Sequence, residues 1–155
     1  MQWVTNKVPV GIARAITKLL GTSEWDLLME ATAGDLLAHN RENPNALLMI
    51  ETYVLMLGEK TIASFELHPM IGCCAICVST AAKVAKKYQG KGLGTILNKL
   101  RIHLAREQRY GTLLCTNVAT NIPQRKILKK NGWKDIFTFL NPRTGNKIFI
   151  SVVKL

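Results

Sequence analysis

The spacing of apolar residues over the first twenty positions predicts a short strand followed by a helix. Residues 3–10 are suited to an opening edge strand. In residues 9–20, Ile12 and Ile16 stand four positions apart on one face, which is helical spacing, and Gly21 is a residue type that commonly ends a helix. The chain is therefore expected to begin with a strand and an amphipathic helix.

Residues 22–37 also carry apolar side chains at helical spacing. A Thr-Ser pair at 22–23 is suited to cap a helix, and Gly34 would interrupt it. The apolar side of this second predicted helix consists of Trp25, Leu28, Met29, Leu36 and Leu37. The Glu-Asn-Pro-Asn stretch at 42–45 then breaks the helical pattern.

From residue 46 the helical spacing gives way to long apolar runs. Residues 46–57 and 61–67 flank a Gly-Glu-Lys turn, which predicts a hairpin. Residues 73–84 form a third run with little alternation between apolar and polar positions. This pattern is typical of a central strand covered on both faces.

In the second half of the chain, helices and strands alternate. Leu97, Leu100 and Leu104 form the apolar stripe of a helix over residues 94–108, whose basic residues, Arg101 among them, are expected toward its other side. The remaining predicted elements are a strand at 113–118, a helix at 121–132 and a final hairpin of strands at 137–140 and 147–154. This order predicts a single α/β domain over residues 1–155 with a mixed sheet.

The most informative stretch is the glycine-rich segment before the helix at 94–108. It reads Gln89-Gly90-Lys91-Gly92-Leu93-Gly94-Thr95. Glycines at alternate positions let the backbone bring its amides close to a ligand, and a loop of such amides before a helix N-terminus binds phosphate. The spacing does not fit a P-loop, because no Gly-Lys-Ser/Thr follows, and the third glycine comes one residue early for a dinucleotide fingerprint.

Two motifs give the chain a resemblance to the GNAT family of acetyl-CoA-dependent N-acetyltransferases. Gln89, Gly92 and Gly94 fit the pattern Q/R-x-x-G-x-G/A. Asn121 and the Gly-Trp pair at 132–133 fit the ends of N-x(6)-Y-x(3)-G-F. The resemblance covers the whole chain, although only the second half carries the motifs. It implies the GNAT fold, a mixed and mostly antiparallel sheet with helices on both faces.

The resemblance also implies how acetyl-CoA would bind. In the family, the strand before the glycine loop and the strand after the following helix splay apart, and the pantetheine arm fills the slot. Carried over by position, Val84 and Lys86 offer backbone groups to that arm, and Asn121 contacts its far side. The amides from Gln89 to Thr95 would hold the pyrophosphate. As an alternative role, Asn121 caps the helix that it begins.

The catalytic groups are less well defined by the sequence. Leu128 stands where the family places a tyrosine that protonates the leaving thiolate, and Ser79 stands where some relatives place a base. Glu66 and His68, two positions apart and so on one face of a strand, are the predicted catalytic residues, with Glu51 as a third candidate. A bulged backbone amide at 80–84 is expected to contact the oxyanion. The expected reaction is direct attack of the amine in a ternary complex, without a covalent enzyme intermediate.

The charge distribution leaves a second class of function open. Residues 1–77 have a net charge of −3 and residues 78–155 a net charge of +14, which together give +11. The basic half favours an anionic ligand such as coenzyme A, and also RNA, DNA or an acidic protein. The alternative function is therefore a nucleic-acid-associated GNAT protein, either a toxin that acetylates aminoacyl-tRNA or a cofactor-binding module with little turnover. The basic residues at issue are Arg125, Lys126, Lys129, Lys130 and Lys134.

The remaining features of the sequence point to a cytoplasmic protein. The four cysteines, at 73, 74, 77 and 115, are expected to be small buried hydrophobic residues rather than metal ligands, because no second pair follows the single C-x-x-C. We expect no metal and no membrane span. The acceptor is a primary amine whose identity the sequence does not define, and a homodimer stays open.

Overall fold

The computed structural model describes residues 2–33 and 49–155 and contains one sheet of eight strands in the order β1-β2-β3-β4-β5-β6-β8-β7. The strands are β1 (Val4–Thr5), β2 (Trp25–Ala33), β3 (Met49–Leu57), β4 (Lys60–Met70), β5 (Cys73–Val84), β6 (Thr112–Val118), β7 (Lys134–Leu140) and β8 (Lys147–Lys154). The helices are α1 (Val10–Leu20), α3 (Leu93–Glu107) and α4 (Ile122–Lys130), with a short 3-10 helix η1 at Lys86–Tyr88.

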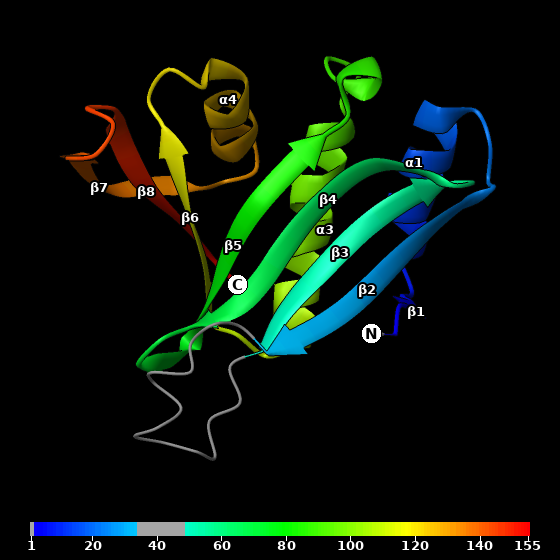
Figure 1. The fold of residues 1–155 in the computed structure, drawn as a ribbon, viewed down its shortest axis with the longest axis horizontal. Coiled ribbons are helices and arrows are strands. Elements are labelled where there is room, and N and C mark those ends of the chain that lie inside the picture. The colour runs from blue at the N-terminus through cyan, green and yellow to red at the C-terminus, as the bar shows by residue number, and fades with distance from the viewer. Residues whose placement is uncertain (1, 34–48) are drawn as a thin grey trace.

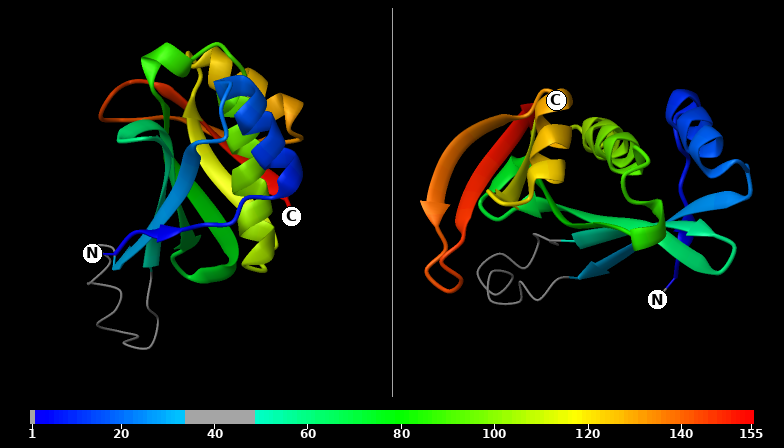
Figure 2. Two further views of the ribbon diagram at one scale, coloured as in Figure 1. Left: turned by 90° about the vertical axis from the view of Figure 1, so that its right-hand side faces the viewer. Right: turned by 90° about the horizontal axis from the view of Figure 1, so that it is seen from above.

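The sheet is mixed because one neighbouring pair of strands is parallel. Strands β1 to β5 pair antiparallel in chain order, β5 and β6 pair parallel, and β8 pairs antiparallel with both β6 and β7 (Figure 1). The predicted mixed, mostly antiparallel α/β architecture is confirmed. In the part of the chain that the structure describes, α1, α3 and α4 all lie on the same side of the sheet rather than on both (Figure 2).

The predicted second helix is wrong where the structure describes it. Residues 25–33 form β2, which pairs with β3 along its whole length, from Trp25 opposite Leu57 to Ala33 opposite Met49. Within β2, the alternate residues Trp25, Leu27 and Met29 pack into the core, so the period of two in the sequence decides the structure. The remainder of that prediction, with Gly34, Leu36, Leu37 and the break at 42–45, lies outside the described residues.

Helix α3 fills the centre of the core beneath the sheet. Its residues Leu93, Leu97, Leu100 and Leu104 are all buried, and burying a leucine side chain completely contributes about 1.5–3 kcal/mol. From the sheet, the rings of Tyr53 and Phe65 stack with their centroids 5.0 Å apart. The core therefore fixes α3 and, with it, the direction in which its N-terminus points.

Of the three cysteines whose burial the structure describes, two match the expectation for buried residues. Cys77 and Cys115 are buried free thiols, whereas Cys73 is half-buried. Burial raises the pKa of the Cys77 thiol to about 12 and that of the Cys115 thiol to about 11. Both are therefore neutral near pH 7 and behave as small apolar residues.

Candidate functional site

The central feature of the site is the divergence of β5 from β6. The two strands pair only where Ile76 to Val78 lie opposite Thr112 to Leu114, and beyond this point they separate (Figure 1). From Ser79 on β5 and Cys115 on β6, the sheet has a V-shaped opening. The splay that the resemblance implied is confirmed.

A bulge in β5 lies inside this opening. In the pairing with β4, Phe65 faces both Ala81 and Ala82, and Ala81 has a φ of +51°, in the left-handed region that non-glycine residues rarely adopt. A bulge bends its strand and leaves one residue outside the ladder. The irregularity that the sequence analysis expected at 80–84 is therefore present.

The glycine loop closes the wide end of the opening. The Gln89 side chain donates from Nε2 to the Val84 carbonyl oxygen at 2.9 Å and so holds the loop against the end of β5. Gly90 and Gly92 have φ values of +72° and +91°, and a Cβ added to either would have no atom within 4 Å. Both positions need glycine for their conformation, and both border open space.

The loop leads into α3 without a side-chain cap. Gly92 is the N-cap residue, and among the described residues no side chain caps the first turn by a hydrogen bond. The first backbone amides of a helix have no partner within the helix, and the helix dipole adds a partial positive charge there. The start of α3 is therefore suited to an anion, and the open space at Gly90 and Gly92 leaves room for one.

A cavity of about 540 Å³ joins the loop to the V-shaped opening. The lining residues that the sequence predicted are Val84, Gln89, Gly90, Gly92, Gly94, Thr95 and Asn121. The lining residues that it did not predict are Ser64, Phe65, Ala82, Lys83, Leu97, Arg101, Pro123, Gln124 and Ile127. Of these, Gln124 and Ile127 follow Asn121 at steps of three on α4, so helical spacing from a known lining residue could have found them.

Three residues of the predicted cofactor set do not line the cavity. The side chain of Leu93 is buried in the core, so only its backbone belongs to the loop. Lys86 and Lys91 are exposed, and the Lys91 ammonium lies 5.9 Å from the centre of the Tyr88 ring. The side chains of Lys86 and Lys91 therefore add positive charge near the loop but do not form part of the cavity wall.

The predicted catalytic residues lie on the face of β4 that points away from the helices. Glu66 and His68 alternate with the buried Phe65 and Leu67, and neither lines the cavity. Glu66 Oε2 accepts a hydrogen bond from the Thr80 hydroxyl at 3.1 Å, whereas His68 Nδ1 lies 3.0 Å from the Pro69 carbonyl oxygen. Ser64, on the same strand, does line the cavity. Glu66 is two positions from Ser64 and His68 is four, so Glu66 is the nearer of the two candidates to the cavity in sequence.

The third candidate, Glu51, belongs to a different cluster. Its Oε2 atom accepts hydrogen bonds from the Tyr53 hydroxyl and from Gln108 Nε2, each at 2.6 Å. Burial, reinforced by Glu51, raises the pKa of Tyr53 well above its usual value, so the phenol keeps its proton. Glu51 therefore anchors the end of α3 to the sheet.

Asn121, the N-cap residue of α4, and Leu128, within α4, have different surroundings. Asn121 caps the helix, since its Oδ1 accepts from the Gln124 amide at 3.3 Å, and it also lines the cavity. Leu128 is buried in the core and is absent from the cavity wall. No proton donor therefore stands at the position where the family has its tyrosine.

Arg101 is the charged residue that the sequence analysis placed wrongly. It was expected on the polar side of α3, yet it is only 3% exposed and lines the cavity. The reason is geometric, because Arg101 follows Leu97 by four residues and so lies on the same face. Its Nη1 atom donates to the Ser79 hydroxyl oxygen at 2.9 Å, and burial lowers the pKa of its guanidinium.

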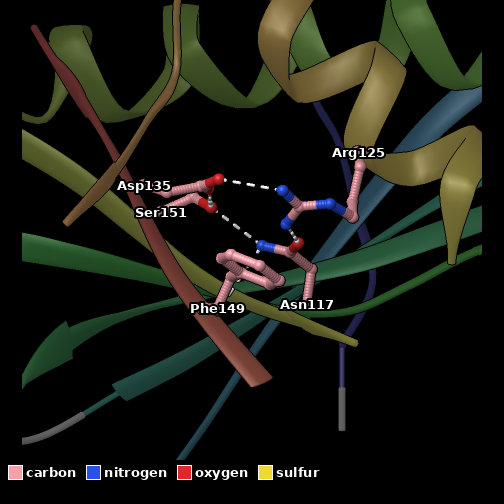
Figure 3. Close-up of polar contacts among 5 residues, drawn as sticks. All are labelled: Asn117, Arg125, Asp135, Phe149 and Ser151. Atoms are coloured by element: carbon pink, nitrogen blue, oxygen red, sulfur yellow. Dashed lines mark hydrogen bonds and ion pairs between the residues drawn. The ribbon is translucent and has the colours of Figure 1, made fainter. Parts of the chain in front are cut away.

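A polar network holds α4, which forms one wall of the cavity, against the C-terminal strands. Arg125 donates to Asn117 Oδ1 at 3.0 Å and to Asp135 Oδ2 at 2.9 Å, while the Ser151 hydroxyl donates to Asp135 Oδ1 at 2.6 Å (Figure 3). Asn117 Nδ2 completes the ring by donating to Ser151 at 2.8 Å. Arg125 thus points inward. It belongs to the group of basic residues that the sequence suggested for contacts with nucleic acid, but its guanidinium is already engaged within the protein.

Comparison with solved structures identifies the fold. An acetyltransferase of the GNAT family from Desulfovibrio desulfuricans superposes with a TM-score of 0.64 at 13% identity, over 99% of this chain and 98% of that one. One from Elizabethkingia anophelis, with acetyl-CoA bound, gives 0.63 at 18% identity over 83% and 98%. One from Bacillus anthracis gives 0.58 at 14% identity over 66% and 65%.

The chain therefore has the fold of the GNAT acetyltransferases, and the resemblance seen in the sequence is confirmed at the level of the fold. No family model and no curated protein matches the sequence. Among the described residues, no helix combines the length and the apolar character that a membrane crossing requires.

Proposed function

We propose that the protein is an N-acetyltransferase that transfers an acetyl group from acetyl-CoA to a primary amine of a small molecule, a peptide or a protein. The observation that carries this proposal is the cavity bounded by β5, the glycine loop, α3 and α4, beside the point where β5 separates from β6. The cavity ends at the N-terminus of α3, behind the glycine loop. A structure with the same fold contains acetyl-CoA. An anionic, elongated thioester matches both ends of such a cavity.

The residues present fit this substrate. The amides from Gln89 to Thr95 would hold the pyrophosphate, each favourable contact contributing about 0.3–1 kcal/mol. The backbone of Val84 and Lys86 and the side chain of Asn121 would contact the pantetheine arm. The bulge at Ala81 supports the proposed oxyanion contact, because a residue outside the ladder has an amide free to point into the opening.

In the proposed reaction, the neutral amine attacks the thioester carbonyl directly. Glu66 is the proposed base, acting on the amine proton directly or through a water, with Thr80 fixing its carboxylate. The alternative base, His68, is two positions further along the same face of β4. No residue forms a covalent acetyl intermediate, so acetyl groups should not be trapped on any cysteine.

Substitution of Gly92 tests the donor site. Gly92→Glu places a carboxylate where the pyrophosphate would lie, and we expect acetyl-CoA affinity measured by calorimetry to fall at least about 100-fold, which corresponds to roughly 2.7 kcal/mol. Gly58→Glu is the matched control, because Gly58 also has a positive φ and open space around it but lies in the β3–β4 turn. Equal affinity in the two variants would contradict the donor site.

A thiol-release assay with a panel of amines tests the reaction itself. Release of coenzyme A that depends on the amine supports the enzyme, whereas binding without release would favour the cofactor-binding module. Binding of tRNA with a steep dependence on salt would favour the nucleic-acid alternative, which the exposed Lys126, Lys129 and Lys130 on α4 leave open.

A further inference from the structure

The buried guanidinium of Arg101 has no anionic partner among the residues that the structure describes. Its only hydrogen bond there is to the neutral hydroxyl of Ser79, and its Nε atom is buried without a hydrogen-bond acceptor. An arginine cannot be neutralised in a protein, so this side chain stays a cation despite the lowering of its pKa by burial. Elsewhere in the described chain, the two carboxylates in ion pairs are those of Glu107 and Asp135.

The position of Arg101 marks the apex of the V-shaped opening. Val78 and Leu114 are the last residues that pair between β5 and β6, and Ser79, the partner of Arg101, follows Val78 directly. On β6 the next residue is Cys115, whose thiol lies close enough for Arg101 to lower its pKa. Burial outweighs that effect and keeps Cys115 neutral, so it does not supply the missing negative charge.

The distance from the glycine loop agrees with the length of the donor's arm. Arg101 follows Leu93 by eight residues, which corresponds to about 12 Å along the axis of α3 at roughly 1.5 Å per residue. The pantetheine arm, with its two amides, is about as long as four extended residues, or roughly 14 Å. If the pyrophosphate binds at the start of α3, the sulfur end of the arm reaches the neighbourhood of Arg101.

A buried cation without an anion is costly to the folded protein. A buried charge without its partner strongly destabilises a folded protein, and apolar residues of similar volume are commonly as good or better for stability. The fold tolerates this cost next to the cavity in which the thioester would lie. The group that would offset it is an anion that forms there, and the reaction generates one when the carbon–sulfur bond breaks.

We propose that Arg101 is a catalytic residue that stabilises the coenzyme A thiolate as it leaves, in place of the proton donor that Leu128 cannot supply. This inference rests on the proposed function. The amine nitrogen forms its bond to the carbonyl carbon and loses a proton to the base or to water, and the carbon–sulfur bond breaks with its electron pair on sulfur. The products are the acetylated amine, a proton and the thiolate, which remains beside the guanidinium until it dissociates.

The test is a pH titration of coenzyme A bound to the protein, followed by the ultraviolet absorbance of the thiolate. We expect the bound thiol to titrate at least about one pH unit below the free thiol in the wild-type protein and to lose this shift in Arg101→Met. Arg101→Lys, which keeps the positive charge, should retain part of the shift. Arg106→Met is the matched control, because Arg106 is exposed on the same helix.

The other titratable groups at the cavity do not interfere with the absorbance titration of bound coenzyme A. Cys115, on β6, has a pKa of about 11 and stays protonated over the useful range. Lys83, on β5, lines the cavity and is present in every variant, while α4 faces it with Gln124 and Ile127, which do not titrate. The absorbance of the protein without coenzyme A gives the background of each variant.

Two further outcomes decide the inference. We expect Arg101→Met without ligand to melt within about 2 °C of the wild type or above it, because an unpaired buried charge is removed, while kcat falls and KM for acetyl-CoA changes little. An identical thiol titration in wild type and Arg101→Met, or a loss of folding in that variant, would overturn the role of Arg101. Failure of the wild-type protein to bind coenzyme A would instead overturn the proposed function.

Discussion

Two arginines on neighbouring helices show opposite solutions to the burial of a positive charge. Arg125, on α4, has a carboxylate in Asp135, an amide in Asn117 and an aromatic ring in Phe149, whose centre lies 3.6 Å from its guanidinium carbon. Arg101, on α3, has one neutral hydroxyl. Yet Arg101 is the more deeply buried of the two, at 3% exposure.

The difference separates a structural group from one available to a ligand. Around Arg125 every interaction connects α4 to β6, β7 or β8, so the cation stabilises the C-terminal half of the sheet (Figure 3). Arg101 is buried at the wall of the cavity, and no carboxylate among the described residues compensates its charge. Arg125 has a carboxylate partner, whereas Arg101 has none among the described residues. The charge of Arg101 is therefore available to an anion from outside the chain.

The largest expected effect on stability is that of Arg125→Met. It leaves Asn117 Oδ1 without its donor, which costs about 1–3 kcal/mol, and removes an exposed ion pair and a cation–π contact that contribute up to about 1 kcal/mol each. We expect the free energy of unfolding in urea to fall by roughly 2–4 kcal/mol. Lys126→Met, on the exposed side of the same helix, should change it little. If Arg101→Met destabilised the protein as much as Arg125→Met, the contrast between the two arginines would fail.

A smaller effect is expected at Asp135, and it depends on pH. The Ser151 hydroxyl and then Arg125 hold the pKa of this carboxyl below its usual value. A lowered pKa in the folded state means that the stabilisation is present above the unfolded pKa of about 4 and is lost as the pH falls through the folded value. Because the side chain is 42% exposed, we expect the contribution to be at most about 1 kcal/mol.

Asp135→Asn therefore should unfold more easily than wild type at pH 7, and the difference should shrink as the pH falls from there through the folded pKa of Asp135, which lies below its usual value. Melting temperatures measured across this range give the comparison, with the exposed Asp26→Asn as the control for loss of a carboxylate. A constant difference between wild type and Asp135→Asn at all pH values would show that the charge of Asp135 does not contribute.

The glycine loop and the segment at 22–37 show how far the sequence can be trusted. The backbone conformation of the loop could be predicted because it depends on local chemistry. Gly90 and Gly92 have positive φ values that few other residue types tolerate. Residues 25–33 carried apolar side chains at both helical and strand spacing, and pairing with β3, a contact far along the chain, decided between them.

Arg101 shows a different limit of the sequence. Helical spacing from Leu97 would have placed it on the buried face, but an arginine within a basic helix is ordinarily exposed, and only the packed structure shows Ser79 as its partner. That no carboxylate pairs with Arg101 in the described part of the chain depends on neighbours from several strands, which the sequence alone does not reveal. The positions of Glu66 and His68, outside the cavity wall, likewise depend on which face of β4 the helices cover.

The smallest predicted effect concerns the ring beneath Arg125. Phe149→Leu keeps most of the apolar bulk but removes the face on which the guanidinium lies, so we expect a loss of about 0.5–1 kcal/mol in urea unfolding. The hydrogen bond from Asn117 Nδ2 to the Phe149 carbonyl oxygen uses only the backbone of Phe149 and should survive the substitution. In a double-mutant cycle with Arg125→Met, most of this loss should disappear, because the ring then has no cation to stabilise. Phe137→Leu, an exposed ring on β7, is the matched control. Additive losses in the cycle would show that Phe149 acts by packing alone, and that Arg125 depends only on its polar partners.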